Sequence, residues 1–184
     1  MSTVSTAVAT TWQVDPVHSH VEFAVRHLMI ATVKGRFAEV SGTLTAGEDD
    51  LDSASIELTI PVASVDTHEA QRDGHLRSAD FFEADTYPAI RFRSTRITKA
   101  GDGTFEVAGH LTIRDVTKPI ALTVHAGGRA RDPWGGERIA YSAETRINRK
   151  DFGLRWNQVL ETGGVAVGDD VKISVELELV RSSN

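Results

Sequence analysis

The sequence of 184 residues contains no cysteine and no long run of apolar residues. The missing cysteines exclude disulfide bonds, a thiol nucleophile and cysteine-ligated zinc or iron–sulfur sites. A transmembrane helix needs about 18 consecutive apolar residues, so none is expected. Met1 to Thr11 have neither a basic residue nor the apolar core of a secretory signal. We therefore predict a cytoplasmic protein.

Positive charge is also scarce, because 20 Lys and Arg residues stand against 26 Asp and Glu residues and give a formal net charge of -6. This sign argues against a nucleic-acid partner. Apolar residues make up 40% of the chain, enough for one hydrophobic core that needs no metal or disulfide. We predict a disordered tail over residues 1–10 and one folded domain over residues 11–184.

Apolar residues recur at every second position from Val21 onward, which is the period of a β-strand with one buried face. The pattern predicts about eight strands, in residues 21–27, 35–45, 56–62, 90–93, 105–113, 120–124, 139–147 and 173–179. Short glycine-containing turns between them favour antiparallel pairing. Closure into a barrel would remove the exposed edges of such a sheet, and a two-sheet sandwich is the alternative.

One segment breaks the alternation. Residues 67–78 are rich in helix-forming side chains and follow Ser64 and Asp66, which are suitable N-caps. We predict a short helical insertion there, with a possible break at Gly74.

Several motifs occur in a fixed order along the chain: Asp15-Pro16-Val17-His18-Ser19, Lys34-Gly35-Arg36-Phe37, Arg72-Asp73-Gly74-His75-Leu76-Arg77-Ser78, Gly109-His110-Leu111-Thr112-Ile113 and Arg149-Lys150-Asp151-Phe152-Gly153-Leu154. In this order they resemble the YceI-like, polyisoprenoid-binding family, and the resemblance runs from about Thr11 to Val180. It implies an all-β, eight-stranded antiparallel lipocalin-like barrel with a helix near one end. It also implies an apolar tunnel for an isoprenoid or another long-chain amphipathic lipid, and a possible homodimer.

We accordingly predict a non-enzymatic lipid-binding protein that needs no cofactor. The candidates for the tunnel wall are the inward-facing apolar residues Phe23, Val25, Phe37, Leu58, Phe92, Leu111, Ile113, Leu122 and Tyr141. The candidates for contacts with a lipid head group are His18, His27, Arg72, His75, Asn148 and Arg149.

A His-assisted enzyme acting on a lipid in the same cavity is the alternative. A nucleophilic group of Ser19, His27 or His75 and Asp73 can be drawn, but no Gly-x-Ser-x-Gly motif presents a serine. A histidine-only metal site can also be imagined, yet the histidines lack a recognisable ligand spacing. We expect no metal.

Overall fold

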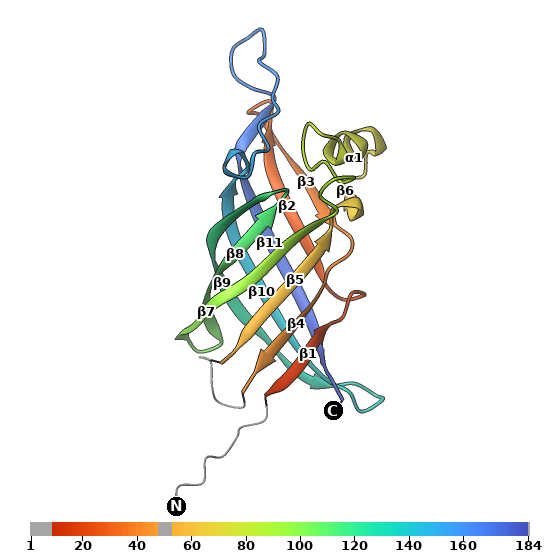
Figure 1. The fold of residues 1–184 in the computed structure, drawn as a ribbon, viewed down its shortest axis with the longest axis vertical. Coiled ribbons are helices and arrows are strands. Elements are labelled where there is room, and N and C mark those ends of the chain that lie inside the picture. The colour runs from red at the N-terminus through yellow and green to blue at the C-terminus, as the bar shows by residue number, and fades with distance from the viewer. Residues whose placement is uncertain (1–8, 48–52, 184) are drawn as a thin grey trace, which may run out of the picture.

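A computed structural model describes residues 9–47 and 53–183 of the chain (Figure 1). Most of the predicted N-terminal tail, residues 1–8, lies outside the described residues, and the first strand begins at Thr10. The strands are β1 (Thr10–Val14), β2 (His20–His27), β3 (Ala31–Phe37), β4 (Ser41–Ala46), β5 (Ser55–Pro61), β6 (Val65–Asp66), β7 (Ala89–Gly101), β8 (Thr104–Ile113), β9 (Val116–Arg131), β10 (Glu137–Asn148) and β11 (Val167–Arg181). The helical elements are η1 (Val62–Ser64), α1 (Ala70–Arg77) and η2 (Arg149–Phe152).

The strands close into an antiparallel barrel. Both β1 and β2 pair with β11, and they pair with β4 and β3 respectively, so β1–β2 and β3–β4 are two interrupted strands. Strand β6 pairs with β3 as β5 pairs with β4, so β5–β6 is a third interrupted strand. With each of the three interrupted strands counted once, the ring has eight strands, and β11 closes it by pairing back with β1. The predicted eight-stranded barrel is thus confirmed, and the sandwich alternative is not the fold.

The two ends of the barrel differ (Figure 1). At one end, called here the helix end, lie α1, the turn between β2 and β3, and the long connection between β10 and β11. At the other, called the terminus end, lie the start of β1, the end of β11 and the turn between β9 and β10. The long strands run between these ends, so the interior of the ring faces two mouths.

The strand boundaries correct the sequence prediction in several places. Strands β7 and β9 extend well beyond the predicted residues 90–93 and 120–124. The segment predicted as one strand over residues 35–45 is two pieces, β3 and β4, separated at residues 38–40. Strand β1 was not predicted, because only Trp12 and Val14 mark its buried face, too few positions to show a period of two.

The predicted helical insertion is present, but its start and its cap differ. Helix α1 begins at Ala70, and its N-cap is Glu69, whose side chain accepts hydrogen bonds from the backbone N–H groups of Gln71 and Arg72. The proposed caps are engaged elsewhere: Ser64 Oγ donates to the carbonyl of Pro61, and Asp66 accepts from Arg36. Gly74 lies inside the helix and does not break it. No described helix is both long and apolar enough to cross a bilayer.

Candidate functional site

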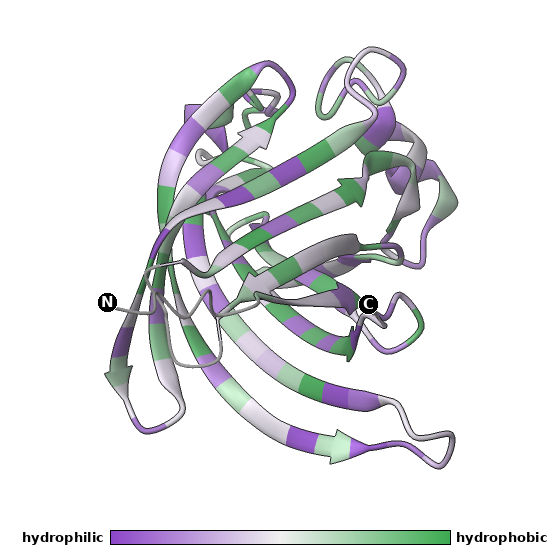
Figure 2. Ribbon diagram, turned by 60° about the horizontal axis from the view of Figure 1, so that its bottom comes forward, coloured by the Kyte–Doolittle hydropathy of each residue, from purple (hydrophilic) through white to green (hydrophobic). Residues whose placement is uncertain are grey.

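The barrel encloses a cavity of about 600 Å³, within the range of roughly 300–1,000 Å³ that is usual for ligand pockets. Hydrophobic and hydrophilic residues alternate along the strands, as Figure 2 shows, so that one face of each strand supplies apolar side chains to the interior. All nine residues predicted for the tunnel wall line this cavity: Phe23, Val25, Phe37, Leu58, Phe92, Leu111, Ile113, Leu122 and Tyr141.

The register of the ladder explains this grouping. Ile97, Val107 and Leu122 are successive cross-strand partners on β7, β8 and β9, and all three line the cavity. Gly109 makes room for the Phe92 ring, because a Cβ there would lie 2.5 Å from Cζ of Phe92. The Phe92 ring therefore lies against the barrel wall at this glycine.

Tyr141 is the one phenol that both sequence and structure place in the wall. Its ring packs edge-on against Phe105 at 6.5 Å between centroids. Burial raises the pKa of the Tyr141 hydroxyl, while the charge of Arg129 acts in the opposite direction.

At the helix end, His27, Arg72 and His75 also line the cavity. Arg72 donates from Nε to Thr67 Oγ1 at 2.8 Å and from Nη2 to the Thr67 carbonyl at 2.9 Å. His75 Nε2 lies 2.8 Å from Asp80 Oδ2, and its ring packs edge-on against Trp156 at 4.7 Å. Arg72 and His75 are thus already engaged in holding the helix end together.

Arg149 is buried, with 5% of its surface exposed, although it too borders the cavity. It donates to the carbonyls of Leu154, Trp156, Val167 and Gly168, all in or next to the connection between β10 and β11. Burial lowers the pKa of the guanidinium, and Asp169, with Oδ1 3.6 Å from Nη2, opposes this shift. The side chain has its donors committed to the protein backbone.

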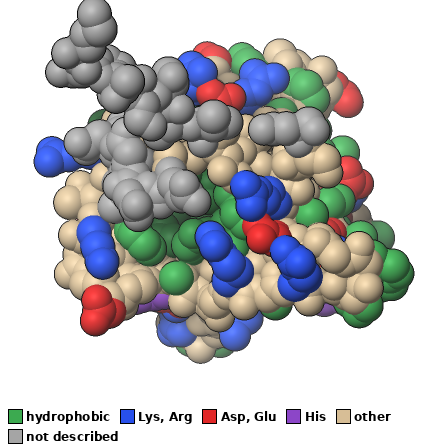
Figure 3. Space-filling model, turned by 90° about the horizontal axis from the view of Figure 1, so that it is seen from below, with side chains coloured by type: hydrophobic (Ala, Val, Ile, Leu, Met, Phe, Trp, Pro, Cys, Tyr) green, Lys and Arg blue, Asp and Glu red, His purple; other side chains and the backbone are tan. Residues whose placement is uncertain are grey.

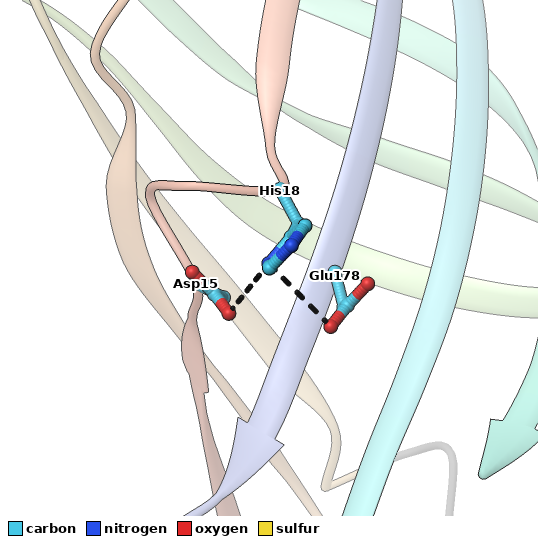
Figure 4. A group of neighbouring side chains, drawn as sticks. All are labelled: Asp15, His18 and Glu178. Atoms are coloured by element: carbon cyan, nitrogen blue, oxygen red, sulfur yellow. Dashed lines mark hydrogen bonds and ion pairs between the residues drawn. The ribbon is translucent and has the colours of Figure 1, made fainter. Parts of the chain in front are cut away.

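The other two head-group candidates lie away from the cavity. Asn148 caps η2 by accepting a hydrogen bond from the backbone N–H of Lys150. His18 lies outside the residues that line the cavity, in the interruption between β1 and β2, and Figure 4 shows it between Asp15 and Glu178. His18 Nδ1 is 3.0 Å from Asp15 Oδ2 and 3.9 Å from Glu178 Oε1.

The ligand atoms of Asp15, His18 and Glu178 all lie within 4.8 Å of one another, a grouping that could hold a cation and that the sequence spacing did not reveal. The positive charge here is supplied by Arg138, whose Nη1 donates to Asp15 Oδ2 at 2.7 Å and to Glu178 Oε1 at 2.5 Å. Burial alone would raise the pKa of Asp15, but hydrogen bonds with His18 and Arg138 lower it to about 2. A metal ion would have to displace a guanidinium that already satisfies both carboxylates.

The nucleophilic group considered from the sequence does not assemble. Ser19 Oγ donates to the carbonyl of Glu178 and accepts from its N–H. Asp73 Oδ1 accepts from the N–H and the hydroxyl of Thr67, and His75 pairs with Asp80. Serine, histidine and aspartate each have a different structural partner.

Sequence reasoning missed one wall of the cavity. Strand β11 contributes Val171, Ile173, Val175, Leu177 and Leu179 to the lining. The alternation of residues 173–179 was visible, and the same criterion that selected Leu111 and Ile113 would have selected these residues. Trp156 also lines the cavity, from a connection that has no periodicity to reveal it.

Comparison with known proteins agrees with this geometry. The chain is 38% identical over 178 residues to Protein YceI of Escherichia coli, covering 96% of this chain and 91% of that protein. Among solved structures, BcnA of Burkholderia cenocepacia matches with a TM-score of 0.78 and 24% identity over 90% of this chain and 98% of that one. A polyisoprenoid binding domain from Saccharophagus degradans, implicated in plant cell wall breakdown, matches with a TM-score of 0.67 and 18% identity over 93% and 98% of the two chains. Residues 12–179 match the YceI-like domain, and the chain therefore belongs to the YceI-like family.

Proposed function

We propose that the protein binds the tail of an isoprenoid or a similar long-chain amphipathic lipid inside the barrel and does not alter it chemically. The observation that carries this proposal is the cavity of about 600 Å³ with apolar side chains from all around the ring. The family membership supports it, as does the fold shared with a domain described as polyisoprenoid binding.

The energetics fit such a ligand. Each CH₂ group transferred from water contributes about 0.8 kcal/mol, so part of a long tail is enough for tight binding. A repetitive apolar tail makes similar contacts in any apolar tunnel, so selectivity comes from the length of the cavity and from polar groups at its mouths.

The test is extraction of the purified protein with organic solvent, followed by mass spectrometry of the extract. The wild type is expected to yield a long-chain lipid, unchanged after incubation with the protein. Leu122→Trp places a larger ring in the cavity wall and should lower the amount recovered, at a stability cost of roughly 1–3 kcal/mol. Ala121→Trp is the matched control, because Ala121 is the exposed neighbour of Leu122.

Equal lipid recovery from Leu122→Trp and Ala121→Trp would contradict binding at this wall, and a chemically altered lipid would favour the enzyme alternative. A cytoplasmic location and a homodimer remain predictions, which cell fractionation and sedimentation will test.

A further inference from the structure

Three arginines lie on the inner face of the barrel at the terminus end. Arg129 is the ladder partner of Ile139, which in turn pairs with Leu179. Ile139 and Leu179 are buried in the core, with 6% and 2% of their surfaces exposed. Directly paired residues in a sheet share a face, so Arg129 faces the barrel interior. Arg131, two residues further along β9, shares that face because the side chains of a strand alternate.

The third arginine comes from β11. Arg181 is the ladder partner of Trp12, a buried core residue of β1, and lies two residues after the inward-facing Leu179. The seam that closes the barrel therefore brings Arg181 to the same inner face as the arginines of β9.

Glu137 brings two of the three arginines, Arg131 and Arg181, to one place. Arg181 Nη1 lies 2.8 Å from Glu137 Oε2, and Arg131 Nη2 lies 3.6 Å from Glu137 Oε1. A hydrogen bond from Arg181 lowers the pKa of this carboxyl, and the charges of Arg131 and Arg129 add to the shift. Two guanidinium groups thus contact one carboxylate, and the Arg129 guanidinium, over the Trp12 ring, adds to the excess of positive charge.

The three arginines lie on the inner face just beyond residues that line the apolar cavity, such as Leu179. The Arg129 guanidinium lies 5.6 Å from the ring centroid of Trp12, and its charge reaches Tyr141, which lines the cavity. Across the ring, Lys99 pairs with the cavity-lining Phe105 and shares its face. Viewed from this end, Figure 3 shows a hollow with hydrophobic side chains inside it and several Lys and Arg side chains around it.

We propose that Arg129, Arg131 and Arg181 form a binding site for an oxyanion, the phosphate or carboxylate head group of the amphiphile whose tail fills the cavity. This proposal rests on the proposed function and adds the orientation of the ligand: the tail points toward the helix end. Guanidinium groups match phosphate and carboxylate through paired N–H donors. Glu137 already serves as one such anion.

The orientation is opposite to one in which the head-group candidates Arg72, His75 and Arg149 would hold the head group at the helix end. There, Arg149 donates to four backbone carbonyls, and Arg72 is tied to Thr67. At the terminus end, Arg131 and Arg181 are 70% and 50% exposed, and among the described residues Glu137 is the one carboxylate that pairs with them. Their remaining N–H donors face water and are available to a ligand.

The experiment compares farnesyl diphosphate, farnesoic acid and farnesol as ligands, by titration calorimetry at low salt. The double variant Arg129→Gln/Arg131→Gln should weaken binding of the diphosphate by about tenfold or more and that of farnesol by less than about twofold. A similar loss for farnesoic acid shows a general oxyanion site, whereas a loss confined to the diphosphate assigns the site to phosphate. Salt should weaken binding of the diphosphate to the wild type more than binding of farnesol.

Arg96→Gln is the matched control. Arg96 is exposed, and its partner Ala108 lies between the inward-facing Val107 and Gly109, so Arg96→Gln removes one positive charge from the outer face, where the double variant removes two from the inner face. The diphosphate should bind this variant like the wild type.

Two results would overturn the site: equal losses for farnesyl diphosphate and farnesol in the double variant, or a diphosphate-specific loss in Arg72→Gln instead. Binding of inorganic pyrophosphate as tight as that of farnesyl diphosphate would show a free-anion site and overturn the assignment to a lipid head group. Failure of the proposed function can be told apart from failure of this site. If the barrel bound no lipid tail, the wild type would bind neither farnesol nor farnesyl diphosphate.

Discussion

Arg149 illustrates how a buried charge in a binding protein can serve the fold. Its side chain donates hydrogen bonds to the carbonyls of Leu154, Trp156, Val167 and Gly168, which lie in or next to the connection between β10 and β11. Leu154 and Trp156 lie in the irregular part of that connection, whereas Val167 and Gly168 begin β11, and the Val167 carbonyl also accepts from Nδ2 of Asn157. The arginine supplies donors to these carbonyls and fixes the loop that carries Trp156 against the cavity.

Replacing Arg149 with alanine should therefore destabilise the protein, because buried carbonyls lose their donors. We expect a decrease of about 2–3 kcal/mol in the free energy of unfolding, measured by urea denaturation. Arg155→Ala, an exposed arginine in the same connection, should change it by less than about 0.5 kcal/mol.

The two variants also separate the structural role of Arg149 from a ligand-binding role. If Arg149→Ala retained full stability but lost affinity for farnesyl diphosphate alone, the arginine would be a head-group ligand after all.

At the scale of elements, α1 is attached to the barrel mainly by polar contacts. Asp73, buried with 8% exposure, accepts from the N–H of Thr67 at 2.8 Å and from its hydroxyl at 2.6 Å. Arg77 donates to the carbonyls of Ala63 and Val65, in and just after η1. Leu76 is the apolar side chain of this helix that packs against the core, and the His75 ring packs edge-on against Phe81 and Trp156. A helix with so little apolar contact depends on its hydrogen bonds for its position.

Asp73→Ala should loosen this helix, because the buried N–H and hydroxyl of Thr67 lose their acceptor. We expect a loss of about 1.5–3 kcal/mol in stability and faster hydrogen exchange at the α1 amides. Gln71→Ala changes an exposed position of the same helix and should leave exchange unaltered. Unchanged exchange in Asp73→Ala would mean that Arg77 and Leu76 suffice to hold the helix.

The sequence predicts these elements to different extents, for physical reasons. Where a strand is long and has one buried face, as in residues 105–113, alternation alone places each side chain inside or outside. It cannot locate the interruption at residues 38–40 or the cap at Glu69, which depend on local hydrogen bonds. Nor can it show that Arg129 and Arg181 share a mouth, because that follows from the register of distant strands.

At the scale of the whole molecule, barrel closure depends on the short strand β1, which pairs with both β4 and β11. Arg138 reinforces this seam from the outside. It donates to Asp15, which follows β1, to Glu178 on β11, and to Asp132 in the turn between β9 and β10. Three segments far apart in sequence are thus joined by one guanidinium.

The seam should make stability sensitive to acid. Because the folded-state pKa of Asp15 is lowered from 3.8 to about 2, its ionised form stabilises the native state. This contribution is fully present above the unfolded pKa and is lost as the pH falls through about 2. The urea midpoint of the wild type should therefore exceed that of Asp15→Asn by a constant amount above about pH 5. The difference between the urea midpoints of the wild type and Asp15→Asn should decrease steadily between about pH 4 and pH 2.

Asp85→Asn, at an exposed aspartate, is the control and should follow the wild type at every pH. The Arg138→Gln background provides a second check, because the carboxylate of Asp15 then has no guanidinium to pair with. In that background, Asp15→Asn should change the urea midpoint less, and the change should depend less on pH. A gap that stayed constant down to pH 2 would mean that Asp15 holds the seam through the shape of its hydrogen bonds with Val17 and Arg138, and that its charge contributes nothing.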